Sequence, residues 1–184
     1  MSSFRGFIAI EINATATLLE FENEIKKTGA DVKLVEPKNI HITLKFLGDV
    51  EENLVDNIEN IMKDAVDQLQ PFTIKLKGTG VFPHQNYVRV IWIGIKDGQV
   101  IEKISHAIDE RLSTLGFKKE KRGFSPHLTI GRVKTAKNKQ QLLTTIEKYG
   151  DREFCVQQIT SITLKKSDLT PAGPIYTNVK DVVF

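Results

Sequence analysis

The chain has a single cysteine, Cys155, in 184 residues. One cysteine excludes an internal disulfide and the zinc clusters that need several thiolates. The sequence also lacks any apolar run near the roughly 20 residues that a membrane-spanning helix needs. The short apolar stretch 6–10 meets Glu11 at once, so we expect no secretory signal peptide there. These absences favour a reducing, cytoplasmic setting without a membrane partner.

A strong charge of one sign is missing as well. The 26 Lys and Arg residues stand against 23 Asp and Glu residues, which gives a formal net charge of +3. Such a balance permits an anionic partner without requiring one. With 40% hydrophobic and 27% charged residues, the composition is that of an ordinary globular protein. The length suffices for one large domain or two small lobes around a real core.

Hydrophobic periodicity predicts the same order of elements twice along the chain. Gly29 and Gly116 are predicted to end helices. The predicted strands are 4–12, 39–47, 72–82, 87–95, 123–133, 154–167 and 175–184, and the predicted helices are 15–27, 51–69, 100–116 and 138–149.

Two β-α-β-α-β units of similar spacing predict an α+β fold of two pseudo-symmetric lobes. We expect mainly antiparallel sheets, helices on the outer faces and a sheet-lined cleft between the lobes. Residues 1–184 would form a single bilobal domain. The first repeat would cover about 1–83 and the second about 84–184, with room for strand exchange between the lobes.

Two of the four histidines lie in apolar strand-like segments and are followed two positions later by threonine. The segments read "NIHITLKFLG" and "SPHLTIGRV". Because side chains alternate along a strand, His41 and Thr43 share one face, as do His127 and Thr129. Pseudo-symmetry would bring the two pairs towards each other in the cleft. The sequence therefore predicts two imidazoles and two hydroxyls around one small volume.

Such a volume suits a phosphodiester. A neutral imidazole can accept a proton from water while a charged one gives a proton to the leaving oxygen. Threonine hydroxyls can donate to the phosphate oxygens. The scheme requires no metal, and the chain offers no acidic cluster beside the histidines to hold one. A lone His-x-Thr is usually a core histidine, but two at equivalent places in the two halves make that interpretation the weaker one. His84 and His106 match no such pattern and are expected at the surface.

With both motifs in view, the chain resembles the two-histidine phosphoesterase superfamily. Within it, the sequence is similar to the RNA 2′,3′-cyclic phosphodiesterases, also called 2′-5′ RNA ligases, of archaea and bacteria. The resemblance covers essentially the whole chain. It rests on "HITLKFLG" and "HLTIGRV" together with "FRGFIAIEI", "GVFP", "RVIWIGI" and "KKSDLTPAGPIY".

The resemblance implies hydrolysis of a terminal 2′,3′-cyclic phosphate on RNA to a 2′-phosphomonoester, with weak reversible 2′-5′ joining. It implies His41 as the proton donor and His127 as the proton acceptor, a polarity that symmetry alone does not assign. Thr43 and Thr129 would hold phosphate oxygens. No cofactor or metal is implied, RNA ends such as those of tRNA splicing are the expected partner, and we expect a monomer.

Arg132 and Phe46 occupy equivalent places, five positions after the two histidines. The resemblance implies that Arg132 contacts phosphate and that Phe46 stacks a base, which suits single-stranded RNA. Strict alternation turns both side chains away, so each reaches the site only through a bulge or a strand end. The alternatives are a solvated arginine and a core phenylalanine. By the same alternation, Lys45 would share the face of His41.

Other residues have weaker signals. The basic stretch 119–124 could steer RNA or simply be hydrated. Trp92 and Phe82 are expected in the core rather than as stacking platforms. The turn-rich segment 170–176 is expected to cover one lobe, from which Tyr176 could reach the cleft, and the role of Arg5 is open.

Two other functions compete with the phosphodiesterase. A nucleotide- or RNA-binding module could keep the cleft without chemistry, although binding alone needs no complementary acid and base. A related hydrolase could act on a small cyclic nucleotide such as ADP-ribose 1″,2″-cyclic phosphate. The basic stretch favours RNA only weakly.

Overall fold

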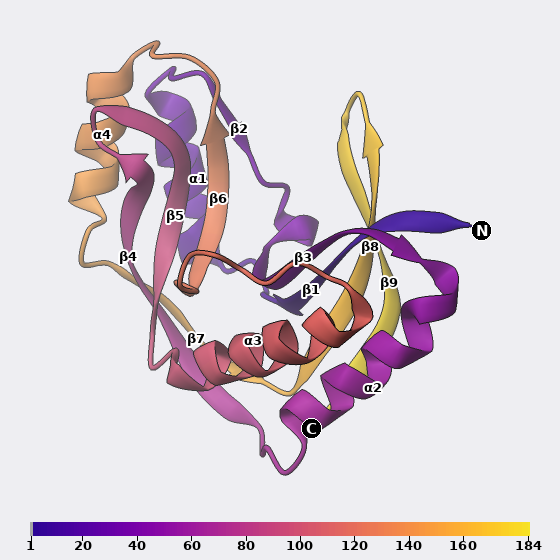
Figure 1. Ribbon diagram of the computed structural model, residues 1–184. Coiled ribbons are helices and arrows are strands. Elements are labelled where there is room, and N and C mark those ends of the chain that lie inside the picture. Colours follow the sequence, from indigo (N-terminus) through magenta and orange to yellow (C-terminus); the bar gives the residue numbers. More distant parts are fainter. Residues whose placement is uncertain (1) are drawn as a thin grey trace.

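The computed structural model describes residues 2–184. In that part of the chain, four α-helices accompany two antiparallel sheets (Figure 1). The strands are β1 (Ser3–Glu11), β2 (Val32–Leu34), β3 (His41–Glu51), β4 (Phe72–His84), β5 (Tyr87–Lys96), β6 (His127–Val133), β7 (Glu153–Ile159), β8 (Ser161–Thr170) and β9 (Gly173–Val183). The helices are α1 (Ala16–Lys27), α2 (Val55–Val66), α3 (Gln99–Leu112) and α4 (Lys139–Lys148).

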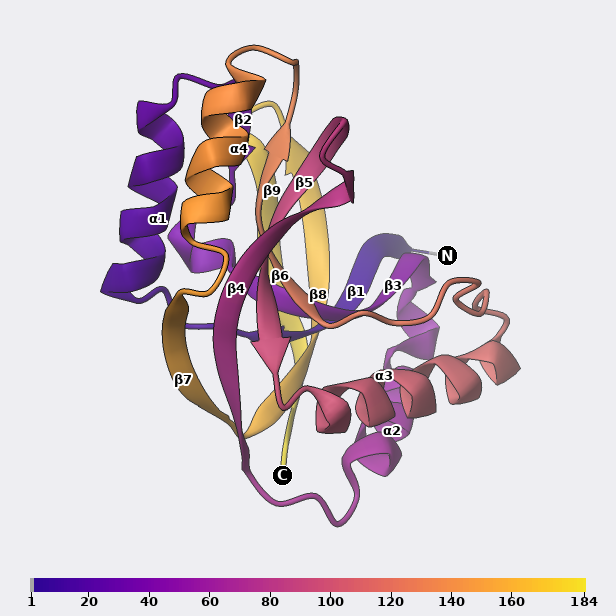
Figure 2. The same ribbon diagram turned by 90° about the vertical axis from the view of Figure 1, so that its left-hand side faces the viewer.

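Each sheet is covered by a pair of helices. The five-stranded sheet has the order β2-β6-β5-β4-β7, and α1 and α4 pack side by side against it (Figure 2). The four-stranded sheet has the order β3-β1-β8-β9, and α2 and α3 pack against its outer strands. All strand pairs are antiparallel. The predicted α+β class with outer helices is confirmed. No helix in the described chain is long and apolar enough to cross a membrane.

Both sheets take strands from both halves of the sequence. β1 and β3 pair with β8 and β9, whereas β4 extends the sheet of β5, β6 and β7. The helices cross over as well, because α1 contacts β2 and β7 while α3 contacts β3. The two halves of the chain are therefore interleaved, and neither sheet forms from one half alone.

The predicted strand 154–167 is wrong as a single element. The chain breaks at Thr160, so that β7 joins the five-stranded sheet and β8 joins the four-stranded one. The segment contains neither Gly nor Pro, and its apolar residues persist through the break, so periodicity alone could not place it. The strand β2 was also missed, because three residues are too few to show a period.

Helix ends follow local capping chemistry. The hydroxyl of Thr15 accepts a hydrogen bond from the N–H of Leu18 and starts α1. Gly29 and Gly116 adopt φ values of 66° and 90°, which confirms both as stop signals. The second helix is shorter than predicted, since residues 52–54 form a 3₁₀ turn and α2 ends at Val66.

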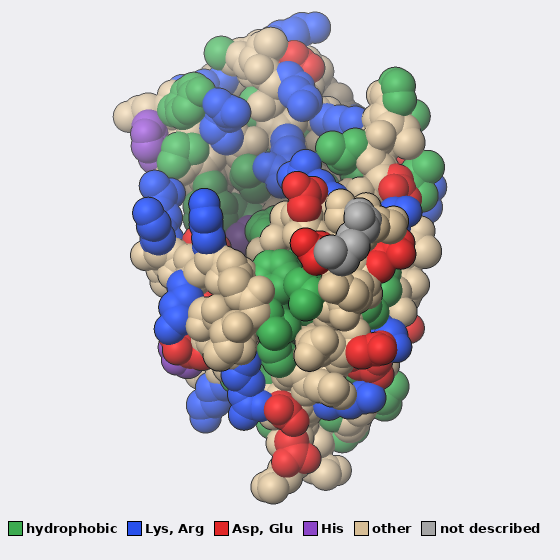
Figure 3. Space-filling model, turned by 45° about the vertical axis from the view of Figure 1, so that its right-hand side comes forward, with side chains coloured by type: hydrophobic (Ala, Val, Ile, Leu, Met, Phe, Trp, Pro, Cys, Tyr) green, Lys and Arg blue, Asp and Glu red, His purple; other side chains and the backbone are tan. Residues whose placement is uncertain are grey.

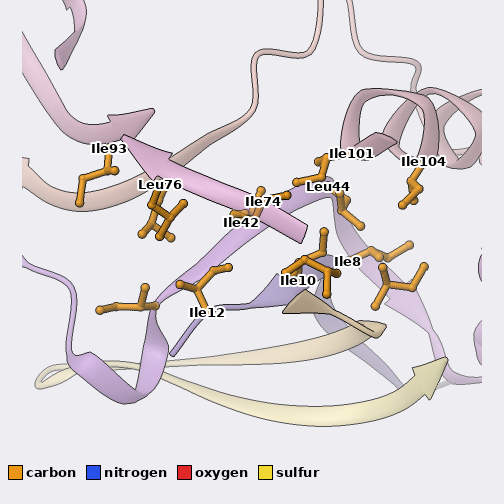
Figure 4. Close-up of a cluster of buried hydrophobic side chains, with 14 of the residues drawn as sticks. Ile8, Ile10, Ile12, Ile42, Leu44, Ile74, Leu76, Ile93, Ile101 and Ile104 are labelled. Atoms are coloured by element: carbon orange, nitrogen blue, oxygen red, sulfur yellow. The ribbon is translucent and has the colours of Figure 1, made fainter. Parts of the chain in front are cut away.

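A continuous apolar core lies between the sheets and their helices. Alternate residues of β1 and β3 meet β4, β5 and α3 there (Figure 4). Ile8, Ile42, Ile74, Ile93 and Ile101 are fully buried. Ile42 belongs to the inward set of β3, which leaves its neighbours His41 and Thr43 to face the open side.

Glu22, on the buried face of α1, has a carboxyl group that makes folding stability depend on pH. Its side chain is only 4% exposed, and its Oε1 has no hydrogen-bond partner within residues 2–184. Burial raises its pKa to about 7, with the charge of Lys26 opposing the shift. The folded state thus holds a proton that the unfolded chain releases near pH 4.5. Stability must therefore fall as the pH rises from about 4.5 through 7.

Glu22→Gln should raise the free energy of unfolding by about 1–2 kcal/mol at pH 8 and change it little at pH 5. Urea unfolding at the two pH values measures the difference. Glu102→Gln, at an exposed position of α3, serves as the matched control. An equal effect of Glu22→Gln at both pH values would contradict the titration and point to packing instead.

Candidate active site

His41 begins β3 with its ring held by the backbone. Its Nδ1 lies 2.6 Å from the carbonyl oxygen of Asn39. A carbonyl only accepts, so Nδ1 carries the hydrogen and donates it. Nε2 lies 3.1 Å from Oγ1 of Thr43, which confirms that the two side chains share a face. In the neutral ring, Nε2 is therefore the basic nitrogen and faces the hydroxyl.

His127 begins β6 with the same arrangement. Its Nδ1 donates to the carbonyl oxygen of Ser125 at 2.7 Å, two residues earlier in the chain. Nε2 is thus the nitrogen left for proton transfer. Thr129 follows on the same face and, like His127, is half-buried. The two histidines lie in different sheets, yet both have the hydrogen on Nδ1 and both leave Nε2 available.

Aromatic rings hold both imidazoles in place. The ring of His41 packs against Phe7 at 5.0 Å and against Tyr176 at 5.4 Å, the latter nearly perpendicular. The ring of His127 packs edge-to-face against Phe82 at 5.0 Å. The prediction that Phe82 belongs to the core is wrong, because it is half-buried beside this histidine. Such contacts restrict ring rotation and fix the direction of Nε2.

The two motifs lie close together, since β3 and β6 contact each other across the sheets. The electrostatics of Tyr176 also indicate that the two motifs are close to each other. Burial raises the pKa of its hydroxyl, and the positive charges of Arg132 and Arg5 oppose the shift. Arg132 from the second motif therefore acts on the residue that packs against His41 of the first. Figure 3 shows a hollow on this side of the molecule, with histidine inside and Lys and Arg side chains at its rim.

A bulge in β3 decides which way the first motif's later residues point. Thr43 pairs with Ala9, but Lys45 rather than Leu44 pairs with Ile8. The prediction that Lys45 shares the face of His41 is therefore wrong, and its side chain is buried on the opposite side. The next residue, Phe46, turns out to the open face. It is 65% exposed, and its ring centroid lies 6.4 Å from that of Phe7.

The second motif has a bulge at the equivalent position. Thr129 pairs with Trp92, but Gly131 rather than Ile130 pairs with Ile91. Arg132 is consequently exposed on the open face. A Cβ at Gly131 would come within 2.8 Å of Val32, so only glycine fits between β6 and β2 there. Each strand thus gains the bulge that Arg132 and Phe46 require.

His41 has a pKa below its ordinary value of 6.5. Burial is the largest cause, and the charge of Lys165 acts in the same direction. The hydrogen bond to Asn39 and the charge of Glu11 oppose the shift. Without an anion in the site, His41 is therefore mostly neutral at pH 7.

A polar network missed by the sequence analysis lies beside His41. Nζ of Lys165 donates to Glu11 at 2.5 Å and to Asn178 at 2.7 Å, and the lysine side chain is almost fully buried. Hydrogen bonding from Lys165 lowers the pKa of Glu11. Glu11, Lys165 and Tyr176 line a cavity of about 190 Å³ that His41 also borders. No short-range sequence signal marks the network, because its partners come from distant strands.

The remaining predicted residues are placed plainly. His84 and His106 are exposed, as predicted. Trp92 is half-buried beside Phe82 at a centroid distance of 5.3 Å, so the predicted core position is wrong for Trp92 as well. Within residues 2–184, no three His, Cys, Asp or Glu side chains are grouped to hold a metal ion.

Comparison with known proteins identifies the family of this chain. Residues 9–168 match the family model of the 2′-5′ RNA ligase superfamily. An RNA 2′,3′-cyclic phosphodiesterase of Methanocaldococcus jannaschii is 48% identical over 96% of this chain and 99% of its own length. The protein of the same name from Methanothermobacter thermautotrophicus is 37% identical, with 96% of each chain covered.

Solved structures share the fold. A Thermus thermophilus protein superposes with a TM-score of 0.81 at 22% identity, with 97% of each chain covered. E. coli LigT complexed with 3′-AMP gives a TM-score of 0.74 at 20% identity, over 99% of this chain and 98% of that one. Because the family model spans most of the sequence and both relatives are more than 30% identical over 96% of it, the chain belongs to the 2′-5′ RNA ligase superfamily.

Proposed function

We propose that this protein hydrolyses terminal 2′,3′-cyclic phosphates on RNA to 2′-phosphomonoesters. The observation that carries the proposal is the matched pair of histidines. Each donates from Nδ1 to a carbonyl two residues earlier, keeps Nε2 for proton transfer, and has a threonine on the same face. A binding module would have no use for two such imidazoles. The names of the relatives supply the substrate class.

In the proposed reaction, Nε2 of His127 accepts a proton from water as its oxygen attacks phosphorus. The bond from phosphorus to O3′ breaks, and Nε2–H of His41 gives its proton to that oxygen. The 2′ ester remains, and the next turnover begins when the two rings exchange protons with solvent. Thr43 and Thr129 donate hydrogen bonds to the non-bridging oxygens. The same steps with a 5′ hydroxyl in place of water would join that hydroxyl to phosphorus as a 2′-5′ linkage while O3′ leaves, and their reversal would cleave the linkage.

The lowered pKa of His41 couples protonation to substrate binding. The free ring is mostly neutral at pH 7, whereas the donor must be charged. A phosphodiester anion beside the ring stabilises the imidazolium and raises its pKa. Substrate binding thus supplies the proton donor that the free enzyme holds only in part.

Phe46 and Arg132 complete the proposed substrate site. Both are exposed five positions after their histidines because of the two bulges. The guanidinium of Arg132 suits a phosphate oxygen, and the exposed ring of Phe46 suits a base.

The wider setting follows from the same chemistry. Acid and base both come from one chain, so a monomer suffices, and residues 1–184 act as one bilobal domain. The imidazole pair needs no cofactor or metal. We expect the substrates to be RNA ends such as those left by tRNA splicing or RNA cleavage, and we expect the protein to act on them in the cytoplasm.

An oligonucleotide ending in 2′,3′-cyclic phosphate tests the proposal when it is incubated with the protein in EDTA. We expect turnover to continue and the product to carry a 2′-phosphate, identified by chromatography against 2′- and 3′-phosphate standards. ADP-ribose 1″,2″-cyclic phosphate in a parallel reaction tests the rival substrate. A 3′-phosphate product, or turnover of the ADP-ribose compound alone, would overturn the proposal.

A further inference from the structure

A groove leaves the site at the far end of β3. It runs between β3 and the segment after α3, has a volume of about 560 Å³, and is here called the β3 groove. Its lining includes the apolar residues Phe46, Leu54, Leu115 and Phe117 together with Lys118. The volume is in the range of ligand clefts, which is about 300–1,000 Å³.

The groove is continuous with the catalytic face. Phe46 contacts Phe7, and Phe7 packs against His41, so one aromatic ring belongs to both the site and the groove. Gly48 and Gly116 border the groove with φ values of 71° and 90°, and a Cβ at either would meet nothing within 4 Å. The backbone at these two places thus leaves open space beside the aromatic rings.

A positively charged segment begins at Lys118, the one cationic residue that lines the groove within the described chain. In the segment 118–122, four of the five residues are Lys or Arg. Lys119 pairs with Glu110, while Lys118, Lys121 and Arg122 are exposed. The carboxylates Asp49 and Glu51 also line the groove, and Asp49 faces Arg5 across the β1–β3 ladder. Figure 3 shows hydrophobic side chains continuing from the histidine-bearing hollow, with Lys and Arg side chains near it.

This cationic segment is fixed in place. Nζ of Lys45 donates to Asp109 at 2.5 Å and to the carbonyl of Lys118 at 2.7 Å. Asp109 in turn accepts from the N–H of Glu120 at 3.1 Å. The β3 bulge turns Lys45 inward to make these bonds, so the bulge that exposes Phe46 also fastens the opposite wall of the groove.

We propose that the β3 groove holds the nucleotides 5′ to the terminal cyclic phosphate of a single-stranded RNA. Bases stack on Phe46 and against Phe117, and the phosphates between them meet Lys118, Lys121 and Arg122. Stacking faces alternating with cations are what a single strand requires, whereas an apolar peptide needs no row of cations. This inference rests on the proposed function, because the strand is positioned by its terminal phosphate between the histidines.

The test is a ladder of substrates with 2′,3′-cyclic phosphate ends, from the mononucleotide to the tetranucleotide, at low and moderate salt. Stacking of an added base should raise kcat/KM about tenfold between the mono- and the trinucleotide. Lys118→Glu/Lys121→Glu should reduce the tri- to mononucleotide ratio at least fivefold and weaken its salt dependence. The control, Lys134→Glu/Lys137→Glu, reverses two exposed charges with the same spacing on the β6–α4 connection and should leave the ratio unchanged.

Fluorescence anisotropy with labelled 2′-phosphate oligonucleotides of the same lengths measures the groove without turnover. Tighter binding of the longer chains, lost in the groove variant and kept in the control, supports the inference. Hydrolysis at equal kcat/KM for all lengths with length-independent binding would overturn the groove assignment and leave the proposed function standing. Failure to hydrolyse any cyclic phosphate would overturn the function, while the binding series would still decide the groove.

Discussion

His41→Ala and His127→Ala should each lower kcat/KM for a cyclic-phosphate oligonucleotide by about 10²–10⁴-fold, the usual contribution of a positioned acid or base. In each ring Nδ1 donates to a backbone carbonyl, so Nε2 is the one nitrogen left for proton transfer, and alanine removes it. Initial rates at several substrate concentrations measure the loss. His106→Ala, which removes an exposed imidazole from α3, should leave the rate unchanged.

The pH dependence separates the two roles. The proposed donor, His41, must be protonated, so kcat/KM must decline as the pH rises above its pKa. Because burial lowers that pKa in the free enzyme, the decline should begin below pH 6.5. The bound phosphate raises the same pKa, so kcat should decline at higher pH than kcat/KM. The proposed acceptor, His127, must be neutral, and its protonation causes the decline towards acid.

Each substitution should therefore remove one side of the profile. His41→Ala leaves only the decline towards acid, and His127→Ala leaves only the decline towards alkali. An exchange of the two results would assign the opposite polarity, with His41 as the acceptor. A bell-shaped profile that survives in either variant would exclude that histidine from proton transfer.

The sequence was sufficient for most elements and for the face that carries the chemistry. Strand alternation placed His41 with Thr43, and the predicted glycines end α1 and the 3₁₀ turn that follows α3. These features are local, because they depend on neighbours within a few positions. The family resemblance then supplied the reaction, which no local pattern could specify.

The sequence analysis named a bulge as the condition for Arg132 and Phe46 to reach the site, but it did not place the bulges. Alternation alone predicted Lys45 on the open face, whereas in the structure a bulge turns it inward. Buried positions after each histidine occur at +1 and +3 and then shift, so that the fifth position is exposed in both motifs. A bulge is set by pairing with the neighbouring strand, which a single strand's sequence does not contain.

Contacts between residues far apart in the chain could not be predicted from the sequence. Lys165 meets Glu11 across 154 positions of the chain, and Tyr176 reaches His41 from β9. The same distance explains the missed break at Thr160, where the chain passes from one sheet to the other. These contacts and the break at Thr160 depend on how the strands of both sheets are ordered. That order follows from the interleaving of the two halves of the chain.

Lys45→Met should destabilise the fold strongly. The side chains of Lys45 and Asp109 are 5% and 14% exposed, and the lysine also binds the carbonyl of Lys118. Removal of one partner leaves a charge with little access to water, which typically costs about 3–5 kcal/mol. The thermal midpoint should fall by roughly 10 °C for a chain of this size. Urea unfolding and calorimetry measure both quantities.

Two comparisons isolate the buried pair. Lys38→Met removes an exposed partner of Glu36 and should change stability by less than about 0.5 kcal/mol. Lys45→Met/Asp109→Leu removes both charges and should recover part of the loss. If Lys45→Met unfolds at the wild-type urea midpoint, the pair does not stabilise the fold.

The pH dependence of the same variant gives a further sign. Burial acts to raise the pKa of Asp109, but the hydrogen bonds from Lys45 and the N–H of Glu120 outweigh it, and the pKa is lowered. A depressed carboxyl pKa stabilises the protein above its ordinary value of 3.8 and loses that contribution as the pH falls through the folded value. The difference in stability between wild type and Lys45→Met should therefore shrink in acid.

Because the same bonds hold segment 118–122, Lys45→Met should also lower the preference for longer RNA, whereas Lys38→Met should not.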